Sequence, residues 1–182
     1  MSSMDIPGLD VSSRVRARDI PMTAIANVQR KLLLISGAVD ATDHDVSMAI
    51  PLPTSGRWTI VKAETNLTDQ TWVAMQITTD EDTTFVSDSD TMISSCQFSK
   101  TFMTPDQRRL TFYQGEVRPG EAAVKMFDLE CTSGRPAYAH ARYSRVATDT
   151  VERSEQVLEQ LIADGMPQKP VLELIVPVTV IG

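Results

Sequence analysis

Three arginines at alternate positions are the most distinctive chemical feature of this sequence. Arg14, Arg16 and Arg18 lie in the stretch SSRVRARDIP. In an extended chain, alternate side chains point to the same side, so the three guanidinium groups would form one basic row. Such a row can bind the phosphates of a nucleic acid or the carboxylates of a protein surface.

The net charge favours a protein partner over a nucleic acid. The 182-residue chain has a net charge of −7 and a pI near 4.8, which excludes a protein that coats nucleic acid with its whole surface. Up to Lys31, five basic and three acidic side chains give +2, which leaves about −9 for the remainder. We expect an acidic surface of a neighbouring subunit to be the first partner, with weak, local genome contact second. The contact residues would be Arg14, Arg16, Arg18, Arg30 and Lys31.

An acid-rich segment could supply ligands for a hard cation. Residues 78–90, TTDEDTTFVSDSD, bring Asp80, Asp82, Asp88 and Asp90 near one another across a short predicted strand. Calcium takes roughly six to eight oxygen ligands, so these four are calcium candidates, with a subunit interface as the setting. The EF-hand spacing is absent, and clustered acids in loops are usually solvated, so we predict no metal site.

Catalytic chemistry has few candidates. His44 and His140 are the two histidines, and no G-x-S-x-G elbow or phosphate-binding glycine pattern occurs. Cys96 and Cys131 form no C-x-x-C pair and are predicted to be reduced core residues. We therefore expect no catalytic residues, no cofactor and no enzyme. A hydrolase that uses His44 or His140 is kept as a third alternative.

Short strands bounded by turn residues predict an all-β body. RWTIVKAET and TWVAMQITT alternate with period two, and in the second we place Trp72, Ala74 and Gln76 opposite Val73, Met75 and Ile77. Similar runs recur at the spacing typical of a sandwich or barrel. They cover residues 31–39, 83–87, 91–99, 109–117, 122–131 and 137–146. We predict an antiparallel, jelly-roll-like β-sandwich over residues 31–182.

Other features lie at the ends of this body. Residues 1–30 show no sustained periodicity and are predicted to form an extended N-terminal arm. A helix is expected over about 149–164, with Gly165 after its last turn. Residues 171–181 predict a long terminal strand, which Pro177 restricts to an edge or bulged position. No secretory signal and no bilayer-spanning segment is expected.

This plan resembles that of small icosahedral viral capsid proteins, which combine a jelly-roll body with terminal arms. A second likeness covers residues 127–148, which are similar to a strand-turn-strand segment of calicivirus-type protruding domains and share Gly134-Arg135-Pro136. The resemblance implies a structural virion protein located in the virion, and in host cytoplasm during assembly. Its implied partners are copies of itself and other capsid proteins.

The expected function is therefore a capsid or capsid-associated subunit that self-assembles through its arm and terminal strand, without membrane contact. The alternative is a β-sandwich binding module for a carbohydrate or receptor, in which Trp58 or Trp72 stacks on the ligand. The first hypothesis predicts an assembly and the second a persistent monomer.

Overall fold

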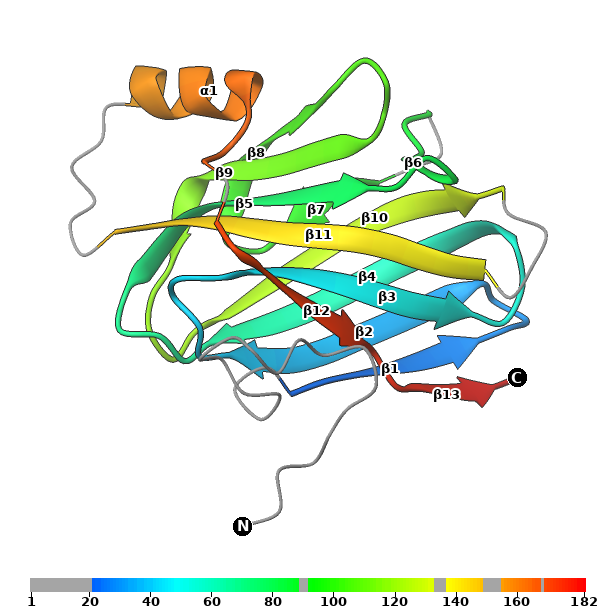
Figure 1. The fold of residues 1–182 in the computed structure, drawn as a ribbon. Helices are drawn as coiled ribbons and strands as arrows, with labels where there is room; N and C mark the ends of the chain where they lie inside the picture. The colour runs from blue at the N-terminus through cyan, green and yellow to red at the C-terminus, as the bar shows by residue number, and fades with distance from the viewer. Residues whose placement is uncertain (1–20, 89–91, 133–136, 149–154, 168) are drawn as a thin grey trace, which may run out of the picture.

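Two β-sheets stacked face to face make up most of the described chain, as Figure 1 shows. The structure is a computed structural model, and it describes residues 21–88, 92–132, 137–148, 155–167 and 169–182. The first sheet has the order β13-β1-β2-β4-β10-β6, with β7 also paired to β10. Its strands are β1 Met22–Asn27, β2 Leu32–Val39, β4 Gly56–Asn66, β6 Thr83–Phe85, β7 Ser94–Ser95, β10 Ala122–Cys131 and β13 Val178–Ile181.

The second sheet has the order β12-β3-β11-β5-β9-β8. Its strands are β3 Asp45–Leu52, β5 Thr71–Thr79, β8 Phe98–Met103, β9 Arg109–Val117, β11 Ala137–Thr148 and β12 Val171–Ile175. The helix α1, Glu155–Asp164, packs on the outer face of this sheet through Leu158 and Ile162. Among the described residues, no helix has the length and apolar character that a membrane span requires.

Period-two alternation places the core between the sheets, and the prediction of an all-β sandwich is confirmed. In β4, Trp58, Ile60, Lys62 and Glu64 are all at most 1% exposed, whereas the residues between them are half-buried. Aromatic side chains fill the space between the sheets, including Phe85 and Phe127, whose rings meet edge to face at 5.5 Å. The interior therefore contains both a large apolar core and several charged groups.

The sheets are mixed, although the sequence pattern suggested antiparallel pairing throughout. Three pairs are parallel, namely β1 with β13, β2 with β4 and β3 with β12. Parallel neighbours need connections that cross the sandwich, and residue alternation alone does not reveal them.

The C-terminal segment joins the two sheets at one side of the sandwich. The expected single strand over residues 171–181 divides into β12, at the edge of the second sheet, and β13, at the edge of the first (Figure 1). Pro177 lies between them, and its carbonyl accepts a hydrogen bond from the Ala24 amide at 3.0 Å. The predicted edge position is confirmed for both pieces, but the division into two strands was not expected.

Three further expectations need correction, and one strand was missed. Residues 22–27, assigned to the arm over 1–30, form β1, in which Met22, Ala24 and Ala26 are buried. The strand β3 was not recognised. A β-bulge in β5 brings Trp72 to the same side as Met75 and Ile77, so its predicted face was wrong. Cys131 is buried as expected, but Cys96 is exposed.

Candidate functional site

The C-terminal strand exposes apolar side chains at a sheet edge. In the described structure β13 pairs with β1 and ends the first sheet, with Val180 56% and Ile181 49% exposed. On β1, Ile25 is 46% exposed and lies directly across from Leu34 on β2, which is 43% exposed. We call Ile25, Leu34, Val180 and Ile181 the terminal-strand surface.

This surface has the chemistry of an association site. The outward-facing positions continue from Leu34 to Val61 on β4 and Met126 on β10, so the apolar row crosses four strands. An edge strand presents unpaired amide and carbonyl groups that can pair with another chain. Apolar side chains next to such an edge add a hydrophobic contribution to that pairing.

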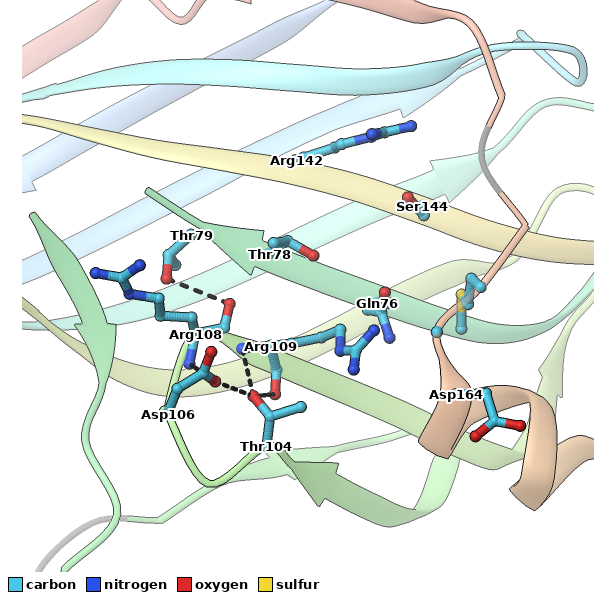
Figure 2. A pocket seen from close by; sticks show the side chains of 12 residues that line it. Gln76, Thr78, Thr79, Thr104, Asp106, Arg108, Arg109, Arg142, Ser144 and Asp164 are labelled. Carbon is cyan, nitrogen blue, oxygen red and sulfur yellow. Dashed lines mark hydrogen bonds between the residues drawn. The ribbon is translucent and has the colours of Figure 1, made fainter. Parts of the chain in front are cut away.

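A polar groove of about 460 Å³ forms the second candidate site, on the outer face of the second sheet (Figure 2). Two rows of side chains cross this face. Arg142 on β11, Thr78 on β5 and Arg109 on β9 are register neighbours in one row, and Ser144 and Gln76 are neighbours in the next. The loop with Asp106 and Arg108 lines one side of the groove, and Asp164 at the end of α1 lines the other, together with Gly165 and Met166.

The groove holds more basic than acidic side chains. Arg108, Arg109 and Arg142 line it, against Asp106 and Asp164. Asp106 accepts hydrogen bonds from the Thr104 hydroxyl and the Arg108 amide, which lower the pKa of its carboxyl group and keep it ionised. The lining therefore has a net charge of about +1 at neutral pH.

Two of the three guanidinium groups have protein partners. Arg142 donates to Asp45 Oδ2 at 2.8 Å and to the Lys169 carbonyl at 3.1 Å, while Arg108 donates to the Glu81 carbonyl at 3.0 Å. The Arg109 guanidinium group makes no hydrogen bond or ion pair with the described residues; the hydrogen bonds of Arg109 come from its backbone. Arg109 is thus the cation most available to a ligand.

A separate cluster of charged side chains lies between the sheets. The interior charge cluster consists of Lys62, Glu64, Lys125 and Arg145, each at most 4% exposed. Glu64 Oε2 lies 2.9 Å from Lys62 Nζ and 3.5 Å from Lys125 Nζ. Lys62 Nζ also lies 2.9 Å from the centre of the Tyr143 ring. Because these groups are closed to solvent, we interpret the cluster as structural.

Burial and mutual attraction shift the pKa values in this cluster. Burial lowers the pKa of Lys62 well below its usual value, and the attraction of Glu64 offsets this only in part. Burial alone would raise the pKa of Glu64, but Lys62, Lys125 and Arg145 together hold it at about 2. Glu64 is therefore an anion surrounded by basic groups.

The predicted basic contacts are only partly described by the structure. Arg14, Arg16 and Arg18 lie outside the described residues, as do Gly134, Arg135 and Pro136. Arg30 is exposed in the turn between β1 and β2. Lys31 contacts the Thr54 hydroxyl and the Ser55 carbonyl, and its Nζ lies 5.2 Å from the Trp58 ring centre. The Lys31 ammonium group thus contacts groups of its own chain.

The calcium candidates do not come together in the described residues. Asp80 and Asp82 are exposed in the turn before β6, whereas Asp88 forms an ion pair with Arg57 at 2.8 Å. Asp90 lies outside the described residues. Within the described part of the chain, no three His, Cys, Asp or Glu side chains form a group that could hold a metal ion.

The tryptophans expected to stack on a ligand, and the histidines considered for catalysis, do not form a site among the described residues. Trp58 and Trp72 are at most 1% exposed, so the expectation that either stacks on a ligand is wrong. His44 Nδ1 lies 3.0 Å from Asp43 Oδ1, and the hydrogen bonds of the described residues add no serine or cysteine to this pair. The side chain of His140 is not among the side chains that the structure describes.

The residues that line the groove were not predicted from the sequence. Arg142 and Ser144, like Thr78 and Gln76, lie two positions apart in a strand. Polar residues at alternate positions indicate a solvated sheet face, so this signal was present. It could not show that β11, β5 and β9 are neighbours, which brings Arg109 beside the others.

Fold and surfaces together define a mixed two-sheet β-sandwich with an apolar edge and a basic groove. The model of a protein family described as "Family of unknown function (DUF6423)" matches residues 22–182, and the chain belongs to that family. The match begins at the first residue of β1. No curated protein and no solved structure matches the chain.

Proposed function

We propose that this protein is a structural assembly subunit, a capsid or capsid-associated component, that associates with copies of itself through the terminal-strand surface. The proposal is carried by one observation: β13 is an edge strand, and it exposes apolar side chains on both of its faces. Val180 lies across from the buried Ala26, and Ile181 lies across from Asn27 on the opposite face. A second chain that adds to this edge would cover both.

The terminal segment is also well anchored for such a role. β12 pairs with β3 over five residues, and the Val176 amide donates to the Ala49 carbonyl at 3.0 Å. Val176 itself is fully buried. Force or strain applied to β13 by a neighbouring subunit would therefore pass to both sheets. We expect the basic residues of the N-terminal region to add contacts to acidic neighbouring surfaces.

Negative-stain electron microscopy of the purified full-length chain tests this proposal. Repeated use of one self-complementary surface produces closed particles or regular filaments. Regular assemblies of uniform size or width would support a virion component. A field of dispersed single subunits at every protein concentration would contradict the proposal.

The second candidate function is a binding module for a carbohydrate or receptor. The groove on the second sheet favours it, because Thr78, Gln76 and Ser144 offer hydroxyl and amide groups beside a guanidinium group. In this version the groove replaces Trp58 and Trp72 as the ligand site. A monomer that binds a ligand in this groove would support the module over the assembly subunit.

A further inference from the structure

We propose that the groove on the second sheet binds a carboxylated saccharide, with Arg109 as the partner of the carboxylate. This inference specifies the site and ligand class of the second candidate function. It is independent of self-assembly, because the terminal-strand surface lies on the first sheet.

The number of available cations favours a ligand with a single negative charge. Arg142 is neutralised by its 2.8 Å contact with Asp45, which is 1% exposed, and Arg108 donates to the Glu81 carbonyl, so Arg109 is the arginine of the lining that is left for a ligand. A polyphosphate or nucleic acid backbone would require several free cations. Arg109 alone can neutralise one carboxylate, and its planar guanidinium group suits a two-point contact.

Gly165 positions the Arg109 side chain at the end of α1. A Cβ atom on Gly165 would lie 2.6 Å from Arg109 Nη1, so a larger residue here would displace the guanidinium group from this position. Gly165 also has a φ of +100°, which favours glycine independently. In Figure 2 the guanidinium group points toward Gln76, across the floor of the groove.

Neutral polar groups beside Arg109 match the hydroxyl groups of a sugar. The Gln76 amide nitrogen donates to the Thr111 hydroxyl at 2.9 Å, which fixes the side chain and leaves its carbonyl oxygen on the groove side. Thr78 and Ser144 add two hydroxyl groups in neighbouring strands. The two hydroxyl groups can each donate and accept hydrogen bonds, as sugar hydroxyls do, and the Gln76 carbonyl oxygen can accept them. The volume of about 460 Å³ lies within the range typical of small-molecule sites.

Titration of the full-length chain by NMR, with amide chemical shifts as the readout, tests the inference. The probes are glucuronate, glucose as its neutral counterpart, and inorganic phosphate as an anion without a sugar ring. We expect saturable shifts around Thr78, Arg109 and Ser144 with glucuronate, and at least about tenfold weaker binding of glucose and phosphate. Equal binding of phosphate, or no saturable binding of glucuronate, would overturn the inference.

Variants separate the role of Arg109 from general charge effects. Arg109→Gln should weaken glucuronate binding by about tenfold or more, whereas Arg30→Gln, at an exposed arginine on the other sheet, should leave it unchanged. Thr78→Val, which keeps the shape of the side chain, should weaken binding several-fold and serves as a second variant if Arg109→Gln unfolds. Unchanged binding in a folded Arg109→Gln variant would refute the inference. An Ile25→Asp/Leu34→Asp variant should bind normally, which separates this test from that of assembly.

Discussion

Lys62 and Glu64 form an ion pair in the interior of the sandwich, with 2.9 Å between Lys62 Nζ and Glu64 Oε2 and at most 1% of either side chain exposed. They lie two positions apart on one face of β4. Lys125 on the adjacent strand and Arg145 on the opposite sheet add two more basic groups. Glu64, the one carboxylate of the interior charge cluster, therefore attracts three basic side chains. Glu64 is therefore the member whose loss should cost most.

Replacing Glu64 by leucine should destabilise the fold by about 3–5 kcal/mol, because Lys62 and Lys125 would remain buried without a counter-ion and Arg145 would keep only the weaker attraction of Asp45. Urea unfolding at neutral pH measures this free energy. The double variant Lys62→Met/Glu64→Leu should recover part of the loss, since it removes one buried cation together with the anion. A loss below about 1 kcal/mol for Glu64→Leu would show that the cluster is not held by charge pairing.

Acid should weaken the folded state through the same carboxylate. The pKa of Glu64 is about 2 in the folded protein, below the usual 4.5, so its contribution is complete above pH 4.5 and is lost as pH falls toward 2. The expected loss from this group is about 3 kcal/mol. Lys62 contributes in the same sense at higher pH. Burial lowers its pKa well below the usual 10.5, so the unfolded chain binds this proton more readily, and stability falls as pH falls from 10.5 to the lowered pKa.

Unfolding of the wild type and of Glu64→Gln at pH 7, 4.5 and 3 measures this dependence. The free energy of unfolding should fall less steeply between pH 4.5 and 3 in the variant, which lacks the titrating group. Parallel pH profiles for the two proteins would contradict the assigned pKa of Glu64.

The sequence predicted the sandwich but not its interior charges. Alternation along RWTIVKAET groups Trp58, Ile60 and Lys62 on one face of β4, but it does not show that this face, with its lysine, is the buried one. The burial of Lys62 depends on counter-charges from Glu64 and from strands distant in the sequence, which no local pattern contains. For the same reason, the neighbouring positions of Arg109 and Arg142 in the groove required the order of β9, β5 and β11.

The boundary of the N-terminal region illustrates a second limit of sequence patterns. β1 alternates Met22, Ala24 and Ala26 inward, but small alanines give a weak hydrophobic signal. Removal of residues 1–20 should leave the melting temperature within a few degrees of wild type, whereas removal of 1–27 should prevent folding, because β1 joins β2 to β13. Circular dichroism melting of both truncated chains tests this. Equal melting temperatures would show that β1 is dispensable.

The two glycines Gly165 and Gly120 provide a matched test of how the groove is positioned. Both have positive φ, but a Cβ atom on Gly120 would meet nothing within 4 Å. Gly120→Ala should therefore cost only about 1–2 kcal/mol of backbone strain. Gly165→Ala should cost a similar amount, because the atom it meets is the end of the flexible Arg109 side chain, but it should displace that side chain and alter the amide shifts of the groove. Unchanged amide shifts around Arg109 in the Gly165→Ala variant would contradict the packing of Arg109 against Gly165.

Self-association through the terminal-strand surface is the central claim, and light scattering coupled to size-exclusion chromatography tests it most directly. The wild-type mass should exceed the 20.1 kDa of one chain and rise with protein concentration. Val180→Asp/Ile181→Asp should return the mass to that of a single chain, because charges at the edge oppose pairing. Leu67→Asp, at a 53% exposed site away from this edge, should behave as wild type. A wild-type mass of one chain at every concentration would contradict the claim.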